Sequence, residues 1–139
     1  MDSCHECQLK ENSMIKNVLI IGAGGFIGTV LRYLTTLFFT KQFPGLLFPL
    51  GTWMVNIIGC LVIGIVFGLS QRFMFHDSPW RMFLTIGICG GYTTFSAFAY
   101  ENILLLQQSD YTTFALYAIS SFVLCLLAVW IGLSLTRVF

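Results

Sequence analysis

Four long apolar stretches, separated by short polar segments, dominate the pattern of hydrophobic and polar positions along the chain. Crossing the hydrocarbon core of a bilayer takes about 20 mainly apolar residues, and each stretch reaches that length. The pattern therefore predicts an all-α integral membrane protein, with spans over about residues 18–39, 50–69, 82–106 and 113–135.

A polar tail with three acidic residues precedes the first span. It lacks the basic start and the small-residue cleavage site of a signal peptide. Met14, followed by Lys16, would itself serve as a translation start. We interpret residues 1–13 as a mobile tail or a start-site extension, and residues 14–139 as one four-helix transmembrane unit.

Composition supports a lipid environment. The chain is 57% hydrophobic and only 9% charged, with a mean hydropathy of +0.84, whereas a soluble domain carries about 25% charged residues. The net charge of +1 and the lack of a basic stripe argue against nucleic acid as a partner. No motif for a membrane enzyme is present, and both histidines lie outside the spans.

The distribution of lysine and arginine predicts the orientation of the chain. Five basic residues lie on the side of the two termini and the second loop, against one on the other side, which favours both termini inside. The five are Lys10, Lys16, Arg72, Arg81 and Arg137, and the one is Lys41.

The first span contains glycines that resemble a dinucleotide-binding loop, at positions 22, 25 and 28. That fold needs an acidic residue about 20 positions later, and residues 40–50 contain none. On a helix, Gly24, Gly28 and Arg32 instead share one stripe, where small residues permit close helix packing. We therefore predict a helix contact face.

Arg32 is the basic residue that lies within a predicted span. An intramembrane charge is a functional candidate by default, and a fixed cation attracts an anion. The alternative is a side chain that snorkels to the interface from about two turns inside the helix. The shared stripe with Gly24 and Gly28 favours the functional interpretation.

The second span places Thr52, Asn56 and Cys60 on one face. An asparagine near mid-span must bond to a neighbour or line water. Spacing alone leaves both alternatives open, because an interhelical hydrogen bond of this kind contributes about 0.6 kcal/mol. Gly64 and Gly68 form a further pair for close packing.

The third span is the most informative. Residues 87–98 place three glycines and three hydroxyls, on Thr93, Thr94 and Ser96, in the middle of an apolar helix. Glycine costs about 1 kcal/mol relative to alanine in a helix, and hydroxyls can satisfy backbone groups freed by a break. We predict an interruption over residues 90–94, with a merely kinked helix as the alternative.

Three further groups are weaker candidates. Phe95 and Phe98 lie one turn apart beyond the expected break, where their electropositive ring edges could face an anion, although packing is the common role of such a pair. Glu101 lies one turn further on, where it could simply mark the membrane boundary. Ser121 and Cys125 in the fourth span could continue a polar track.

The tail sequence Cys4-His-Glu-Cys7 holds two thiols and one imidazole. It lacks the second half of a zinc site. We therefore regard it as incidental.

Taken together, the motifs of the first three spans closely resemble the Fluc/CrcB fluoride channel family over residues 15–139. The motifs that carry the resemblance are Gly24-Gly25-Phe-Ile-Gly28 with Arg32-Tyr33, Gly51-Thr52-Trp-Met-Val-Asn56-Ile-Ile-Gly59, and Gly87-Ile-Cys-Gly-Gly-Tyr-Thr-Thr-Phe-Ser-Ala-Phe98.

The resemblance implies an antiparallel dimer of four-helix subunits in a bacterial inner membrane, with two fluoride pores and passive export of fluoride from the cytoplasm. It implies a structural sodium ion at the dimer centre, held by the main-chain carbonyls of Gly90 and Thr93. It assigns Asn56, Phe95, Ser96 and Phe98 to the fluoride pore and matches Arg32 to the family's first-helix arginine. Thr52, Thr94 and Ser121 are candidates for an accompanying polar track.

Two points qualify the expected assembly and function. The charge bias is larger than expected for a subunit that inserts in both orientations, so a homodimer and a heterodimer with an oppositely oriented relative are both open. The rival function is a small four-helix multidrug exporter, which would need an acidic residue in the first span. Residues 18–39 contain none.

Overall fold

The computed structural model describes residues 2–73 and 78–138, and the side chains of residues 13–73 and 78–137. These residues form helices and loops without a strand: α1 (Asp2–Gln42), α2 (Leu50–Arg72), α3 (Pro79–Met82), the π-helix η1 (Phe83–Cys89), α4 (Gly90–Tyr92), α5 (Phe95–Gln107) and α6 (Tyr111–Val138).

Four stretches of the described chain are long and apolar enough to cross a membrane. They are Ser13–Gln42, Leu50–Arg72, Pro79–Gln107 and Tyr111–Arg137, which confirms the four predicted spans and the all-α membrane class. The helices extend several residues beyond the predicted ends, because helical geometry continues into the polar segments that flank the apolar windows.

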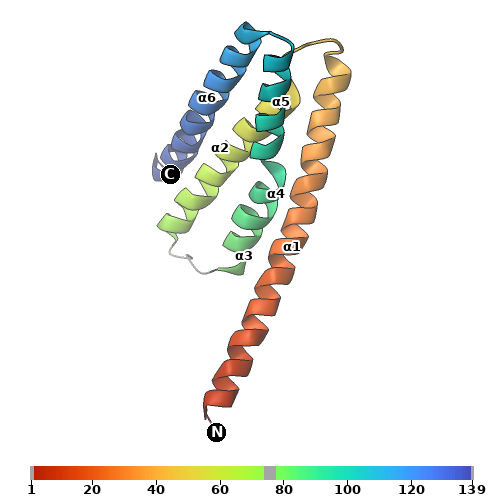
Figure 1. Cartoon of the computed structure of the whole chain (residues 1–139). Helices are drawn as coiled ribbons and strands as arrows, with labels where there is room; N and C mark the ends of the chain where they lie inside the picture. The colour runs from red at the N-terminus through yellow and green to blue at the C-terminus, as the bar shows by residue number, and fades with distance from the viewer. Residues whose placement is uncertain (1, 74–77, 139) are drawn as a thin grey trace.

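Helix α1 begins at Asp2 and continues without interruption into the first span. Its N-terminal part therefore projects well beyond the other helices (Figure 1). The polar tail is thus helical in the structure. The side chains of Cys4 and Cys7 lie outside the described residues.

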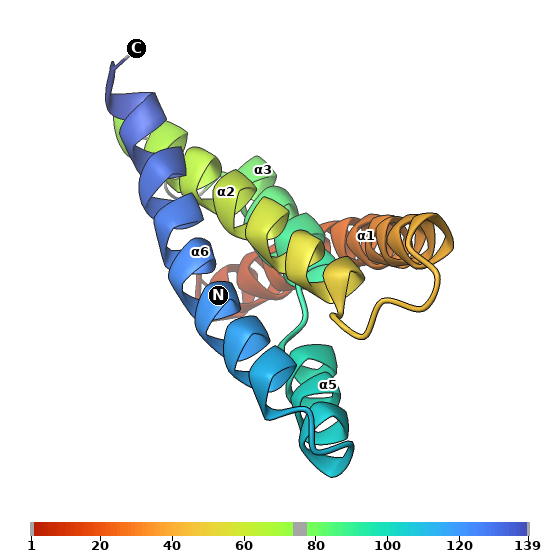
Figure 2. The ribbon, with the colours of Figure 1, turned by 90° about the horizontal axis from the view of Figure 1, so that it is seen from above.

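Successive spans run antiparallel, so that the first and fourth spans bring both termini to the same end (Figure 1). Helices α2 and α6 form the most extensive helix pair, and α1 packs against η1 and α4. Seen from above, α2 lies between α6 on one side and α1 on the other (Figure 2). The third span contacts two of the other spans in this way: its first half packs against α1, and its second half, α5, packs against α6.

Close packing between α1 and the third span depends on glycine. A Cβ atom on Gly24 would lie 2.6 Å from the carbonyl oxygen of Phe83, and one on Gly28 would collide with the carbonyl of Ile88. A Cβ on Gly22 would meet nothing within 4 Å. The predicted contact face of α1 is confirmed, and because these glycines lie inside one helix, a dinucleotide-binding loop is excluded.

Glycines also allow close packing between α2 and α6. A side chain on Gly64 would collide with the Val129 carbonyl, and one on Gly68 with the Thr136 hydroxyl. Gly132 has the same role on α6, since a Cβ added there would lie 2.5 Å from the carbonyl oxygen of Leu61. Small residues on both helices let the two backbones approach closely.

Candidate functional site

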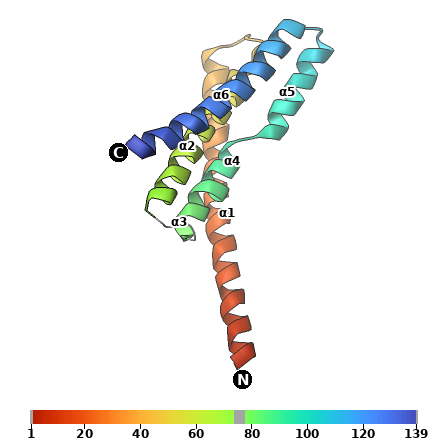
Figure 3. The same ribbon diagram turned by 90° about the vertical axis from the view of Figure 1, so that its left-hand side faces the viewer.

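The third span changes direction at two threonines. Helix α4 ends at Tyr92, Thr93 (ψ 157°) and Thr94 (φ −150°, ψ 119°) are extended, and α5 begins at Phe95. Figure 3 shows the resulting offset, with α3 and α4 following α1 and α5 lying beside α6. The two halves of one span thus pack against different helices.

The glycines of this motif stay helical. Gly90 has φ −64° and ψ −37°, so the interruption that we predicted over residues 90–94 is confined to Thr93 and Thr94. Gly91 has a packing role, because a Cβ there would lie 2.6 Å from the carbonyl oxygen of Gly25. Low helix propensity marked the region, whereas the site of the turn depends on contacts with other helices.

Asn56 of α2 holds the turn in place. Its Nδ2 donates to the Thr94 carbonyl at 3.1 Å, and its Oδ1 accepts from the Thr94 N–H at 2.8 Å. In a continuous helix that N–H would donate to the carbonyl of Gly90. The amide of Asn56 therefore replaces the helical partner and satisfies both backbone groups of Thr94.

Side-chain hydroxyls complete the turn, as the sequence predicted. The Thr93 hydroxyl donates to the Cys89 carbonyl at 2.9 Å. The Thr94 hydroxyl accepts from the Ala97 N–H at 3.2 Å, which makes Thr94 the N-cap of α5, and lies 3.1 Å from the Ser96 hydroxyl. The N–H and carbonyl of Thr94 and the hydroxyls of Thr93 and Thr94 are thus paired at the break, which reduces the cost of interrupting a helix in an apolar environment.

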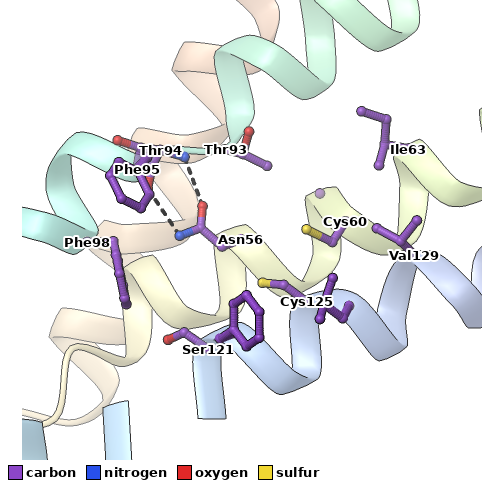
Figure 4. Close-up of a pocket in the computed structure, with 13 residues that line it drawn as sticks. Asn56, Cys60, Ile63, Thr93, Thr94, Phe95, Phe98, Ser121, Cys125 and Val129 are labelled. Carbon is purple, nitrogen blue, oxygen red and sulfur yellow. Dashed lines mark hydrogen bonds between the residues drawn. The ribbon is translucent and has the colours of Figure 1, made fainter. Parts of the chain in front are cut away.

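A cavity of about 380 Å³ lies between this turn, α2 and α6 (Figure 4). It brings together eight of the residues that the sequence singled out: Asn56, Cys60, Thr93, Thr94, Phe95, Phe98, Ser121 and Cys125. None of the described residues that line it is acidic or basic; the others are Gly59, Ile63, Phe122, Leu126 and Val129. Because Phe95 is 79% exposed, the cavity opens to the surface of the protein.

The two phenylalanines lie against each other at the cavity wall. Their ring centroids are 5.7 Å apart at an interplanar angle of 41°. Phe98 also contacts the buried Tyr117 of α6, at 5.1 Å between centroids and an angle of 50°. Packing between two rings fixes Phe98, whereas Phe95 stays largely exposed.

Ser121 contributes a hydroxyl without a partner. The residue is only 6% exposed, and its Oγ makes no hydrogen bond within the described part of the chain. A buried hydroxyl without a partner is costly. The residue borders the cavity, and its Oγ atom is buried at that wall.

Four of the predicted residues lie elsewhere, Gly90 among them. The exposed Ser96 bonds to Thr94 outside the cavity lining. Arg32 reaches the other side of the turn, where its Nη1 donates to the Thr93 carbonyl at 3.4 Å. Thr52 borders a second cavity of about 380 Å³ under the loop between α1 and α2.

Glu101 forms a polar cluster with Thr52 and Tyr117. Its Oε1 accepts from the Thr52 hydroxyl at 2.7 Å, and its Oε2 accepts from the Tyr117 hydroxyl at 2.6 Å. Glu101 is therefore hydrogen-bonded to α2 and α6. The sequence had suggested only that it could mark the membrane boundary. Tyr117 was missed, although it precedes Ser121 by one helical turn and so extends the stripe that includes Cys125.

Known proteins are similar in sequence to this chain over most of its length. The model of the family described as CrcB-like protein, Camphor Resistance (CrcB), matches residues 19–133. A protein of Campylobacter lari named fluoride-specific ion channel FluC is 44% identical over 119 residues, which cover 86% of this chain and 96% of that protein.

Two further relatives carry the same name. The protein of Flavobacterium psychrophilum is 44% identical over 123 residues, covering 88% of this chain and 98% of the relative. That of Azobacteroides pseudotrichonymphae is 39% identical over 127 residues, covering 91% of this chain and all of the relative (100%). A family match across four spans, together with relatives of this similarity, shows that the chain belongs to the CrcB family.

Proposed function

We propose that this protein is a channel that conducts fluoride passively across the membrane. The observation that carries the proposal is the largely apolar cavity at the helix break, which is bordered by the Asn56 amide and the Ser121 side chain and, among the described residues, by no charged group. The name of the relatives, fluoride-specific ion channel, supports the same ion.

The polar groups around the cavity suit an anion. One N–H of the Asn56 amide bonds to Thr94, which leaves the second N–H as a donor, and the Ser121 hydroxyl is unpaired within the described structure. The edges of aromatic rings are electropositive. Helix α5 begins at Phe95, so the positive end of its dipole lies at the same place.

The rival function of a drug exporter finds no support at this cavity. Export of cationic drugs needs a carboxylate that faces the substrate, and no acidic residue lines the cavity among the described residues. Glu101 borders the second cavity, and both of its oxygens accept hydrogen bonds from hydroxyls.

Fluoride efflux from proteoliposomes tests the proposal. Liposomes loaded with potassium fluoride should release it when valinomycin balances the charge, and liposomes loaded with chloride should not. Phe95→Leu and Phe98→Leu should abolish fluoride release because they remove ring edges from the cavity. Phe26→Leu is the matched control, since Phe26 is 73% exposed on α1 and lies outside the cavity lining. Fluoride release no faster than that from fluoride-loaded liposomes without protein would refute the proposed function.

A structural sodium ion fits the backbone at the turn. The Gly90 carbonyl loses its helical partner because the Thr94 N–H bonds to Asn56, and carbonyl oxygens are ligands for hard cations. The Thr93 carbonyl accepts a long hydrogen bond from Arg32 and keeps a second lone pair. We therefore include in the proposal a sodium ion held by these two carbonyls and their equivalents in a second subunit.

Replacement of sodium tests this part. Protein purified and assayed with N-methylglucamine in place of sodium should lose fluoride flux, and restored sodium should recover it. Equal fluoride flux in both cations would reject the sodium site but would not contradict the proposed channel function.

The direction of transport follows from the fluoride gradient. In acid surroundings fluoride enters a bacterium as hydrogen fluoride, ionises, and leaves through a passive channel in the inner membrane.

A further inference from the structure

Two cysteines from different helices meet at the wall of the same cavity. Cys60 lies on α2 and Cys125 on α6, and both line the cavity. Figure 4 shows their sulfur atoms projecting into the gap between these helices. Both are free cysteines.

The pair has no packing explanation comparable to that of the third cysteine in the spans. Cys89 is 3% exposed and does not line the cavity, as expected of a thiol that serves as a small apolar side chain. Cys60 and Cys125 instead face an open space, beside the unpaired hydroxyl of Ser121.

We propose that Cys60 and Cys125 form a dithiol site for soft, thiophilic ligands that bind two sulfurs at once, such as trivalent arsenicals, and that its occupation closes the cavity. Thiols are the soft ligands of proteins and select soft partners. Once one sulfur has reacted, the second is held beside the same atom, so its reaction is intramolecular and strongly favoured. The closure rests on the proposed function, whereas the binding does not.

Phenylarsine oxide is the probe, because it bridges two thiols. Two As–S bonds form, the bond between arsenic and oxygen breaks, and the oxide oxygen leaves as water with the two thiol protons. Arsenic stays trivalent, so no oxidant or reductant is needed.

The binding experiment uses the full chain with Cys4→Ser and Cys7→Ser, because the tail also contains two nearby thiols in sequence. After reduction with a phosphine and its removal, intact mass should show one phenylarsine group per subunit. Cys60→Ser and Cys125→Ser should each abolish this adduct, whereas Cys89→Ser, the matched control, should keep it. A dithiol should remove the group, and a monothiol should not. An adduct that survives the loss of either Cys60 or Cys125 would overturn the site.

Fluoride efflux from the same preparations tests the closure. The probe should block efflux from the background protein and from Cys89→Ser, and a dithiol should restore it. In Cys60→Ser and Cys125→Ser, the ratio of rates with and without the probe should stay near unity. A labelled protein that conducts at its unlabelled rate would overturn the closure. A protein without any fluoride flux would refute the proposed function, and intact mass would still decide the dithiol site.

Discussion

The side-chain amide of Asn56 carries a donor and an acceptor that match the N–H and the carbonyl of a single residue, Thr94. A primary amide presents one acceptor and two donors, and Asn56 uses one of each on the backbone of Thr94. The sequence left two roles open, pore lining and interhelical bonding. The structure shows the bonding directly, and it also places Asn56 at the wall of the cavity.

Replacing Asn56 with alanine should destabilise the protein. The change leaves the N–H and the carbonyl of Thr94 without partners, each of which costs about 1–3 kcal/mol when buried, although interhelical bonds in membranes tend to the low end. We expect a loss of about 1–3 kcal/mol in the free energy of unfolding. Unfolding in mixed micelles with a denaturing detergent measures it.

Asn102→Ala is the matched control for this prediction. Asn102 is also buried in a span, but it donates to the Phe98 carbonyl of its own helix, and its Oδ1 has no partner among the described residues. Its loss should cost less than that of Asn56. Equal losses in the two variants would contradict the role of Asn56 at the turn.

At the scale of elements, the third span is shaped by its neighbours. Its first half must lie against the glycine face of α1, and its second half against α6. A straight helix would follow one of these directions only (Figure 3). The turn at Thr93 and Thr94 lets one span serve both contacts and places the start of α5 beside the cavity.

Gly28→Ala should weaken the contact between α1 and the third span. The added Cβ would collide with the carbonyl of Ile88, and overpacking of this kind costs about 1–3 kcal/mol. Gly22→Ala is the control from the same helix, where a Cβ meets nothing within 4 Å. There the higher helix propensity of alanine should leave stability unchanged or raise it by up to about 1 kcal/mol. Equal unfolding midpoints for the two variants would count against the contact face.

The start of α6 predicts a pH dependence. The Asp110 carboxylate accepts a hydrogen bond from the Thr113 N–H at 3.1 Å, and hydrogen bonds from the side chain and backbone of Thr113 lower the pKa of Asp110. A lowered folded pKa gives a stabilisation that is present above the unfolded pKa, about 3.9, and is lost as pH falls through the folded value.

The thermal midpoint should therefore fall between pH 5 and pH 3 more steeply in the native protein than in Asp110→Asn. Asparagine also caps helices but does not titrate in this range. Differential scanning fluorimetry in detergent checks the comparison. Parallel curves for the two proteins would show that the Asp110 cap carries no pH dependence.

At the scale of the molecule, the apolar surface is the main feature. Large apolar side chains are exposed along all four spans, as in Leu19 (68%), Ile103 (53%) and Leu126 (58%). Lipid covers such a surface, or a second subunit does. Gly90 is exposed, and in the sodium site that we propose a second copy of the chain would supply the remaining ligands.

The chain expressed alone should form an antiparallel homodimer. Chemical cross-linking in membranes should give a dimer, and reporters fused to the C-terminus should show both orientations in the cell. The fraction facing inward should exceed that facing outward, because Lys and Arg favour the inside by five to one. Monomers of a single orientation would instead indicate a heterodimer with an oppositely oriented relative.

The sequence by itself determined the solvent of this protein, its four spans, the glycine contact faces and most of the residues around the cavity. These features depend on local properties, namely the length of apolar stretches and the spacing of residues on a helix. Such properties can be recognised from a short stretch of the sequence alone. Gly24, Gly28, Asn56 and Phe98 could therefore be placed before the structure was known.

Only the tertiary structure decided where the third span turns and which polar groups pair. The glycines marked a weak helix, but the turn occurs two residues past them because Asn56 bonds to Thr94. Likewise, Glu101 bonds to Tyr117 and Thr52, and Cys60 and Cys125 line the same cavity, although the helices involved are far apart in sequence. Pairings of this kind depend on how whole helices pack, and no local spacing contains that information.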